Sequence, residues 1–89
     1  MAAVRIRIAP LLYSYTKGLK TIEVEAGTVR QALAVLDQRY PGIAFRVIDE
    51  QGQIRPHMNI FVGEQSVRDP DAAVPAGAEI YIVGALSGG

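Results

Sequence analysis

The 89-residue sequence contains no cysteine. This absence excludes disulfide bonds, zinc sites built on thiolates and a thiol nucleophile. The sequence also lacks an excess of either charge, because nine Lys and Arg residues balance nine Asp and Glu residues. Proteins bind the phosphate backbone of nucleic acids chiefly through surplus Lys and Arg side chains. We therefore expect no nucleic-acid partner.

Long hydrophobic runs are absent as well. No apolar stretch approaches the roughly 20 residues that a membrane-spanning helix requires, so we expect no membrane partner. Residues 1–7 mix apolar and charged side chains and lack the apolar core of a signal peptide, which makes a cytoplasmic protein the expectation. Histidine is scarce, and the single His57 has no second ligand type close to it in sequence, so we expect no metal site.

The sequence does contain enough apolar material for a packed core. Hydrophobic residues make up 49% of the chain, a share that argues against disorder. A chain of this length has room for one core and no more. We therefore expect a single folded domain.

Apolar and polar residues alternate with a period of two in several places, and this pattern predicts strands. The runs 4–9 and 19–25 are expected to form an antiparallel hairpin, joined by a connector at 11–18. After the middle of the chain, two or three further strands are expected, at residues 58–62, 65–68 and 79–83.

One amphipathic helix of about three turns is predicted between the two groups of strands. Thr28 is a suitable N-cap, and Pro41-Gly42 ends the pattern. The periodicity of segment 43–48 does not distinguish a helix from a strand. It is compatible with a short helical turn followed by an extended piece. The apolar positions at helical spacing are Val29, Ala32, Leu33, Leu36 and Tyr40.

These elements predict an α+β fold in which one main helix packs on one face of a mixed four- to five-stranded sheet. If the first and last strands pair in parallel at the centre, the fold is a ubiquitin-like β-grasp. A ferredoxin-like arrangement would need a second helix, which the pattern does not predict. We expect residues 1–83 to form this domain and residues 84–89 to form a flexible tail ending in a free carboxylate.

Four segments of the chain carry a recognisable pattern: Arg39-Tyr40-Pro41-Gly42, the run from Ile54 to Val62, the loop Pro75-Ala76-Gly77-Ala78-Glu79 and the terminal Gly88-Gly89. With the order of elements, they make essentially the whole chain resemble the MoaD/ThiS sulfur carriers. The chain departs from the usual pattern of that family at Gly63, where members often have asparagine, at Ala78, where they usually have aspartate, and near Gly84, where they usually have proline. The strand Asn59-Ile60-Phe61-Val62 leans toward the carriers of cysteine biosynthesis.

The resemblance implies a function for the end of the chain. In this family a ubiquitin-activating-type enzyme uses ATP to adenylate the terminal carboxylate, which becomes a thiocarboxylate. A biosynthetic enzyme then takes the sulfur for cysteine, molybdopterin, thiamine, tRNA or a specialised metabolite. The modified residue would be Gly89, and Leu86, Ser87 and Gly88 would thread the partner's active site. The chain itself would have no catalytic residue and bind no cofactor.

Two other functions are compatible with the same features. The chain could be a ubiquitin-like modifier that is joined to target lysines through Gly89. It could also be the small subunit of a molybdopterin synthase, with its tail held in the partner. Finding Gly-Gly remnants on lysines would favour the first, and stable co-purification with a larger subunit would favour the second.

A docking surface for such partners is expected on the sheet. Phe61, Tyr81 and Val83 fall on the strand faces opposite the isoleucines, so a helix on the isoleucine face would leave them as an apolar patch toward solvent. The alternative is that a loop or the segment 43–48 covers them.

Several charged residues have two possible roles. Arg5, Arg7 and Arg68 could complement an acidic groove on a partner, or they could simply be solvated. Glu23 and Glu25 alternate along a strand and are expected to face water, because a catalytic carboxylate pair needs a pocket that so small a fold rarely offers.

Overall fold

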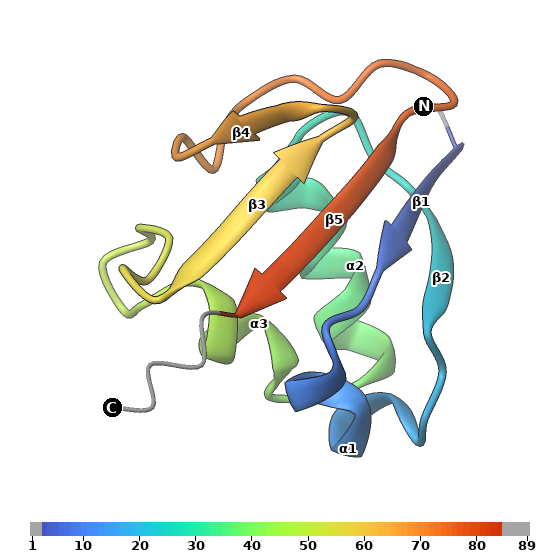
Figure 1. Ribbon diagram of the computed structural model, residues 1–89, viewed down its shortest axis with the longest axis vertical. Helices are drawn as coiled ribbons and strands as arrows, with labels where there is room; N and C mark the ends of the chain where they lie inside the picture. Colours follow the sequence, from blue (N-terminus) through green and yellow to red (C-terminus); the bar gives the residue numbers. More distant parts are fainter. Residues whose placement is uncertain (1–2, 85–89) are drawn as a thin grey trace.

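The computed structural model describes residues 3–84. Strands lie toward both ends of this range, and the longest helix lies between them (Figure 1). In chain order the elements are β1 (Ala3–Arg7), the 3-10 turn η1 (Pro10–Leu12), α1 (Tyr13–Thr16), β2 (Thr21–Glu25), α2 (Val29–Arg39), α3 (Ile43–Val47), β3 (Met58–Val62), β4 (Gln65–Val67) and β5 (Glu79–Gly84).

The strands of residues 3–84 form one five-stranded sheet in the order β2-β1-β5-β3-β4. β1 and β5 are parallel neighbours at its centre, with Ile6 opposite Ile80. β2 is antiparallel to β1, and β3 is antiparallel to both β4 and β5. This is the β-grasp arrangement, so the predicted fold class is confirmed. The last strand ends one residue later than expected, at Gly84.

The two faces of the sheet differ in what covers them. Alternate residues of β1 and β2 are buried and exposed, as a period of two requires when one face is covered. In Figure 1, α2 and α3 lie behind the sheet, against its apolar face. The strand residues buried there, none more than 5% exposed, are Val4, Ile6, Ile22, Val24, Met58, Ile60, Ile80 and Ile82.

The ends of α2 are fixed by side chains. The hydroxyl of Thr28 accepts from the backbone N–H of Gln31 at 3.1 Å, and the Gln31 side chain accepts from Gly27 N–H at 2.8 Å. The Thr28 hydroxyl satisfies an amide group that the first turn leaves free, and the Gln31 side chain ties the residue before the N-cap to the helix. At the other end, the Asp37 carboxylate accepts from Gly42 N–H at 3.0 Å. The predicted N-cap and helix end are both confirmed.

The connector expected at 11–18 does join the two strands of the predicted antiparallel hairpin, but it is partly helical, which the sequence did not indicate. It contains η1 and α1, so residues 3–84 hold three α-helices, where the sequence predicted one main helix and a short helical turn at 43–48. Pro10 suits the first position of a helical turn because it has no N–H to satisfy. Leu12 and Thr16 are fully buried, and the Thr16 hydroxyl donates to the carbonyl of Leu19 at 2.9 Å. Each of these two short elements buries only one side chain, so the segment is too short to show a helical periodicity in the sequence.

The segment 43–48 behaves as its two-part pattern predicted. α3 ends at Val47, and Ile48 is extended and bridges Ile54. Ile43 and Val47 are fully buried in the core beside α2. The segment therefore lies on the helical side of the sheet and does not cover the opposite face.

Arg68 has a structural role that the sequence did not indicate. Its guanidinium donates to the carbonyl oxygens of Ile54 and Arg55, both at 3.1 Å, and to that of Met58. These three acceptors lie in the turn that leads into β3. Because its donors are engaged within the chain, Arg68 fixes this turn, and the suggestion that it complements an acidic partner is corrected.

Replacing Arg68 by Met keeps most of the aliphatic stem but removes all three donors. We expect the free energy of unfolding to fall by about 2 kcal/mol, since charged hydrogen bonds to partly buried carbonyls are lost together. Urea denaturation followed by circular dichroism measures this. Lys20→Met, at an exposed residue, is the control and should change stability by less than about 0.5 kcal/mol. Equal losses in both variants would contradict the structural role.

Candidate functional site

The described chain leaves the sheet at Gly84, the last residue of β5, which pairs with Met58 on β3. A Cβ atom at Gly84 would overlap the side chain of Leu11 and lie 3.4 Å from the sulfur of Met58. Glycine at this position lets the strand end between those two side chains. Leu86, Ser87, Gly88 and Gly89, the predicted tail residues, lie outside the described residues.

Phe61, Tyr81 and Val83 are brought together on the face of the sheet opposite α2. Phe61 and Tyr81 are paired across β3 and β5, with ring centroids 6.5 Å apart. Val83 lies two residues beyond Tyr81, so its side chain points to the same face. Tyr81 is 40% exposed, and the other two are half-buried. The three therefore form a continuous apolar patch.

Leu11 extends this patch, although the sequence reasoning did not select it. It is 40% exposed and lies over Gly84. A groove of about 360 Å³ runs between the turn at Ala9–Leu11 and the end of β5, from Tyr81 to Gly84. Within a connector, a single Leu gives no periodic signal, and only the fold shows that it faces this groove. We call Leu11, Phe61, Tyr81 and Val83 the tail-side patch.

Arg5 and Arg7 are on the same face as the patch, and each has a partner within the chain. Arg5 pairs with Glu23, and Arg7 pairs with Glu79, both at 3.8 Å. The Arg7 guanidinium also lies 5.1 Å from the centre of the Tyr81 ring. Exposed pairs of this kind contribute little to stability. They border the patch with mixed charge rather than with a basic surface.

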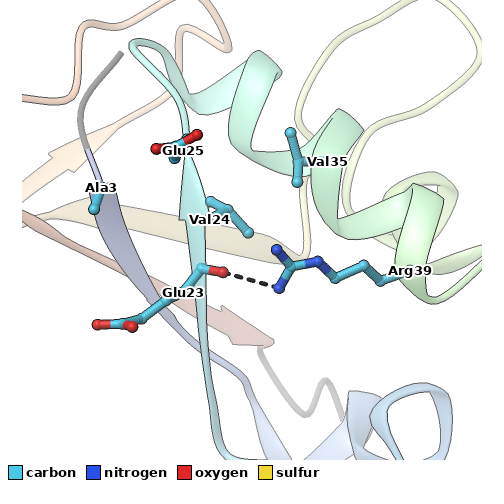
Figure 2. Close-up of a pocket in the computed structure, with 6 residues that line it drawn as sticks. All are labelled: Ala3, Glu23, Val24, Glu25, Val35 and Arg39. Carbon is cyan, nitrogen blue, oxygen red and sulfur yellow. Dashed lines mark hydrogen bonds between the residues drawn. The ribbon is translucent and has the colours of Figure 1, made fainter.

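Figure 2 shows a separate hollow of about 430 Å³ between β2 and α2. It is lined by Ala3, Glu23, Val24, Glu25, Val35 and Arg39. Arg39 donates to the backbone oxygen of Glu23 at 2.9 Å, while the Glu23 carboxylate points away from Arg39 (Figure 2). The Glu23 side chain is 73% exposed, and Glu25 is also exposed. Both face water as predicted, and the Arg39 contact satisfies a carbonyl on the free edge of β2.

The clearest pKa perturbation lies away from the tail-side patch. Arg30 donates to Asp71 at 2.8 Å, and this hydrogen bond lowers the pKa of the Asp71 carboxyl. The pair holds the loop before β5 against the start of α2. Among residues 3–84, no three His, Asp or Glu side chains are grouped closely enough to hold a metal ion. The helices of that range are all too short or too polar to cross a bilayer.

A comparison with protein families matches the model of the ThiS family to residues 12–89. The chain belongs to the ThiS family. The match covers most of the β-grasp body and continues through Gly88-Gly89, so it includes the predicted tail. The resemblance to MoaD/ThiS proteins is therefore confirmed.

Individual proteins agree with this assignment. The sulfur carrier protein CysO of Mycobacterium tuberculosis is 28% identical, over 97% of this chain and 98% of the relative. A chain in the crystal structure of the BexX/CysO complex of Amycolatopsis orientalis has a TM-score of 0.89 and 28% identity, covering 97% of this chain and 99% of that one. SAMP1 of Haloferax volcanii has a TM-score of 0.78 and 26% identity, covering 99% and 100%.

Proposed function

We propose that this ThiS-family protein is a sulfur carrier whose Gly89 carboxylate is adenylated and then converted to a thiocarboxylate. The observation that carries the proposal is the family match through residue 89, on a chain that spans 98% of the CysO relative. That relative is named as a sulfur carrier protein. The fold supports the same function, because β5 ends beside an exposed apolar patch on which a partner can dock.

The chemistry requires only a carboxylate from this chain. A carboxylate oxygen attacks the α-phosphorus of ATP, so that an acyl adenylate forms and pyrophosphate leaves. Hydrosulfide then attacks the acyl carbon, and AMP leaves with the bonding electrons. The resulting thioacid loses a proton to give the thiocarboxylate, whose sulfur is the nucleophile in the acceptor enzyme. The partner enzyme supplies the catalytic groups. We propose that the cycle runs in the cytoplasm, where ATP is available.

Intact-mass spectrometry tests the proposal directly. The protein is incubated with ubiquitin-activating-type enzymes, ATP and sulfide, and its mass should rise by the difference between one sulfur and one oxygen atom. Omitting ATP is the control, and it should leave the mass unchanged. No gain with any such enzyme, while a CysO protein gains sulfur in the same assay, would overturn the proposal.

The tail-side patch is proposed as the docking surface for the activating enzyme. Tyr81→Ala removes an exposed aromatic ring from the centre of this patch, so the KM for the carrier should rise about tenfold. The kcat should stay the same, since docking contributes equally to the ground state and the transition state. Steady-state kinetics at varied carrier concentration measure both values. An unchanged KM would contradict docking through Tyr81.

A second candidate function is protein modification through Gly89. The observation that favours it is the similarity to SAMP1 of Haloferax volcanii, which is a small archaeal modifier protein. Target lysines in cell extracts should then carry the C-terminal end of this chain. Chymotrypsin, which can cleave after Leu86, would leave a Ser87-Gly88-Gly89 remnant on these lysines, and the remnant should disappear when the gene is deleted. If the thiocarboxylate forms but no such remnants are found, protein modification is contradicted and only the carrier function is supported.

A further inference from the structure

Phe45 is the most exposed large hydrophobic side chain among residues 3–84, at 56%. It lies on α3, and the guanidinium of Arg55 covers its ring at 4.6 Å from the centroid. Arg55 also donates through Nε to the backbone oxygen of Phe45 at 2.8 Å. Arg46 and His57 line the same hollow of about 310 Å³. We call Phe45, Arg46, Arg55 and His57 the basic cluster.

The position of the basic cluster connects it with the end of β5. His57 directly precedes Met58, and Met58 is paired with Gly84. Figure 1 shows the loop between α3 and β3 at the same end of the sheet as the arrowhead of β5. Arg68 holds the backbone of this loop through Ile54, Arg55 and Met58. The cluster is therefore held beside the point where the described chain ends.

Within the part of the chain that the structure describes, no ion pair neutralises the positive charge of the cluster. The ion pairs found among residues 3–84 involve Arg5, Arg7 and Arg30. Neither Arg46 nor Arg55 takes part in any of those pairs, and no Asp or Glu side chain of the described range lines the hollow. The whole chain has a net charge of zero, so this concentration of cations is local. Cations kept together beside an exposed aromatic ring are suited to a partner with carboxylates and an apolar side chain.

We propose that the basic cluster docks an acidic segment of the adenylating enzyme that receives the tail. The proposal rests on the carrier function and adds a second contact surface to it. A polynucleotide partner is disfavoured, because binding phosphates along a strand requires basic residues spread over a longer surface. Paired with the tail-side patch, the cluster would hold the carrier on both sides of the departing chain and orient Gly89 for entry.

Charge reversal with a matched control tests this. Arg46→Glu/Arg55→Glu places two anions in the cluster, and Lys17→Glu/Lys20→Glu makes the same change in net charge before the edge strand β2. With the adenylating enzyme that gives the mass gain, the first variant should raise the KM for the carrier about tenfold with kcat unchanged. The control should stay within about twofold, because Lys17 and Lys20 do not line the hollow of the basic cluster.

Two further measurements keep the test decisive. Arg46→Lys/Arg55→Lys keeps the charge and should retain most of the affinity. Raising the salt concentration should increase the KM of the wild type, because it screens an attraction, and should lower that of the reversed variant, because it screens a repulsion. If the double variant does not fold, Arg46→Glu alone serves, since Arg46 makes no hydrogen bond among those found in residues 3–84.

The outcomes separate this inference from the carrier function. A mass gain in the wild type, with equal KM values for the cluster variant and the control, would overturn the acidic docking site and leave the carrier function standing. No mass gain in the wild type with any activating enzyme would overturn both. Equal salt dependence in the wild type and the reversed variant would also count against the cluster.

Discussion

Removing Gly88 and Gly89 is expected to abolish thiocarboxylate formation without changing the stability of the domain. The deletion moves the free carboxylate to Ser87, where a side chain would meet any channel shaped for glycine. Among residues 3–84 the buried core residues lie between Val4 and Ile82, and the deletion leaves all of these in place. Intact-mass spectrometry should show no sulfur gain, and the midpoint of thermal unfolding should agree with that of the full chain.

A chain extended by one alanine after Gly89 is the matched control for this deletion. It keeps both glycines but places the carboxylate on a different residue. If the reaction requires Gly89 to be last, this variant should also gain no sulfur. Full sulfur gain in the shortened chain would show that the carboxylate of Gly89 is not the reacting group.

Ile80→Ala should cause the largest loss of stability among single substitutions in the sheet. Ile80 is fully buried on β5, the central strand, between Ile6 of β1 and Val62 of β3. Truncating such a side chain removes apolar contact and leaves a cavity, at a cost of about 3 to 4 kcal/mol. That is a large part of the roughly 5 to 10 kcal/mol that stabilises a small domain. Equilibrium denaturation in urea measures the loss.

The neighbouring residue provides the comparison. Tyr81 is on the same strand but on the exposed face, so Tyr81→Ala should cost less than about 1 kcal/mol of stability. The effects on docking should be reversed: Tyr81→Ala raises the KM, and Ile80→Ala leaves it unchanged wherever the variant is folded. If both variants had the same effects, the two faces would not have the separate roles proposed here.

Most of the secondary structure follows from local patterns. Val4, Ile6 and Ile8 alternate with polar or small residues, and Thr28 with Gln31 closes the start of the helix. The parallel pairing of β1 with β5 does not follow in this way. Ile6 and Ile80 are far apart in sequence, so no window of residues contains their contact. The order of elements is compatible with this pairing but does not require it. The resemblance to a known family favoured it.

The candidate site is predicted only in part for the same reason. The apolar patch of Phe61, Tyr81 and Val83 was found because strand periodicity assigns each residue to a face. Leu11 and Phe45 were missed because they lie in a connector and on a short helix. The contact of Phe45 with Arg55 depends on the bridge between Ile48 and Ile54, which turns the chain back on itself.

The position of β5 at the centre of the sheet affects when the domain can fold during translation. β5 is the last described element, yet it separates the β1–β2 hairpin from the β3–β4 hairpin. During translation the two hairpins cannot join into one sheet until β5 has left the ribosome, since each pairs with it and not with the other. A product terminated before Glu79 would expose both inner edges to proteases and aggregation. Cells would therefore keep, as folded molecules, those chains that had been translated at least to Gly84.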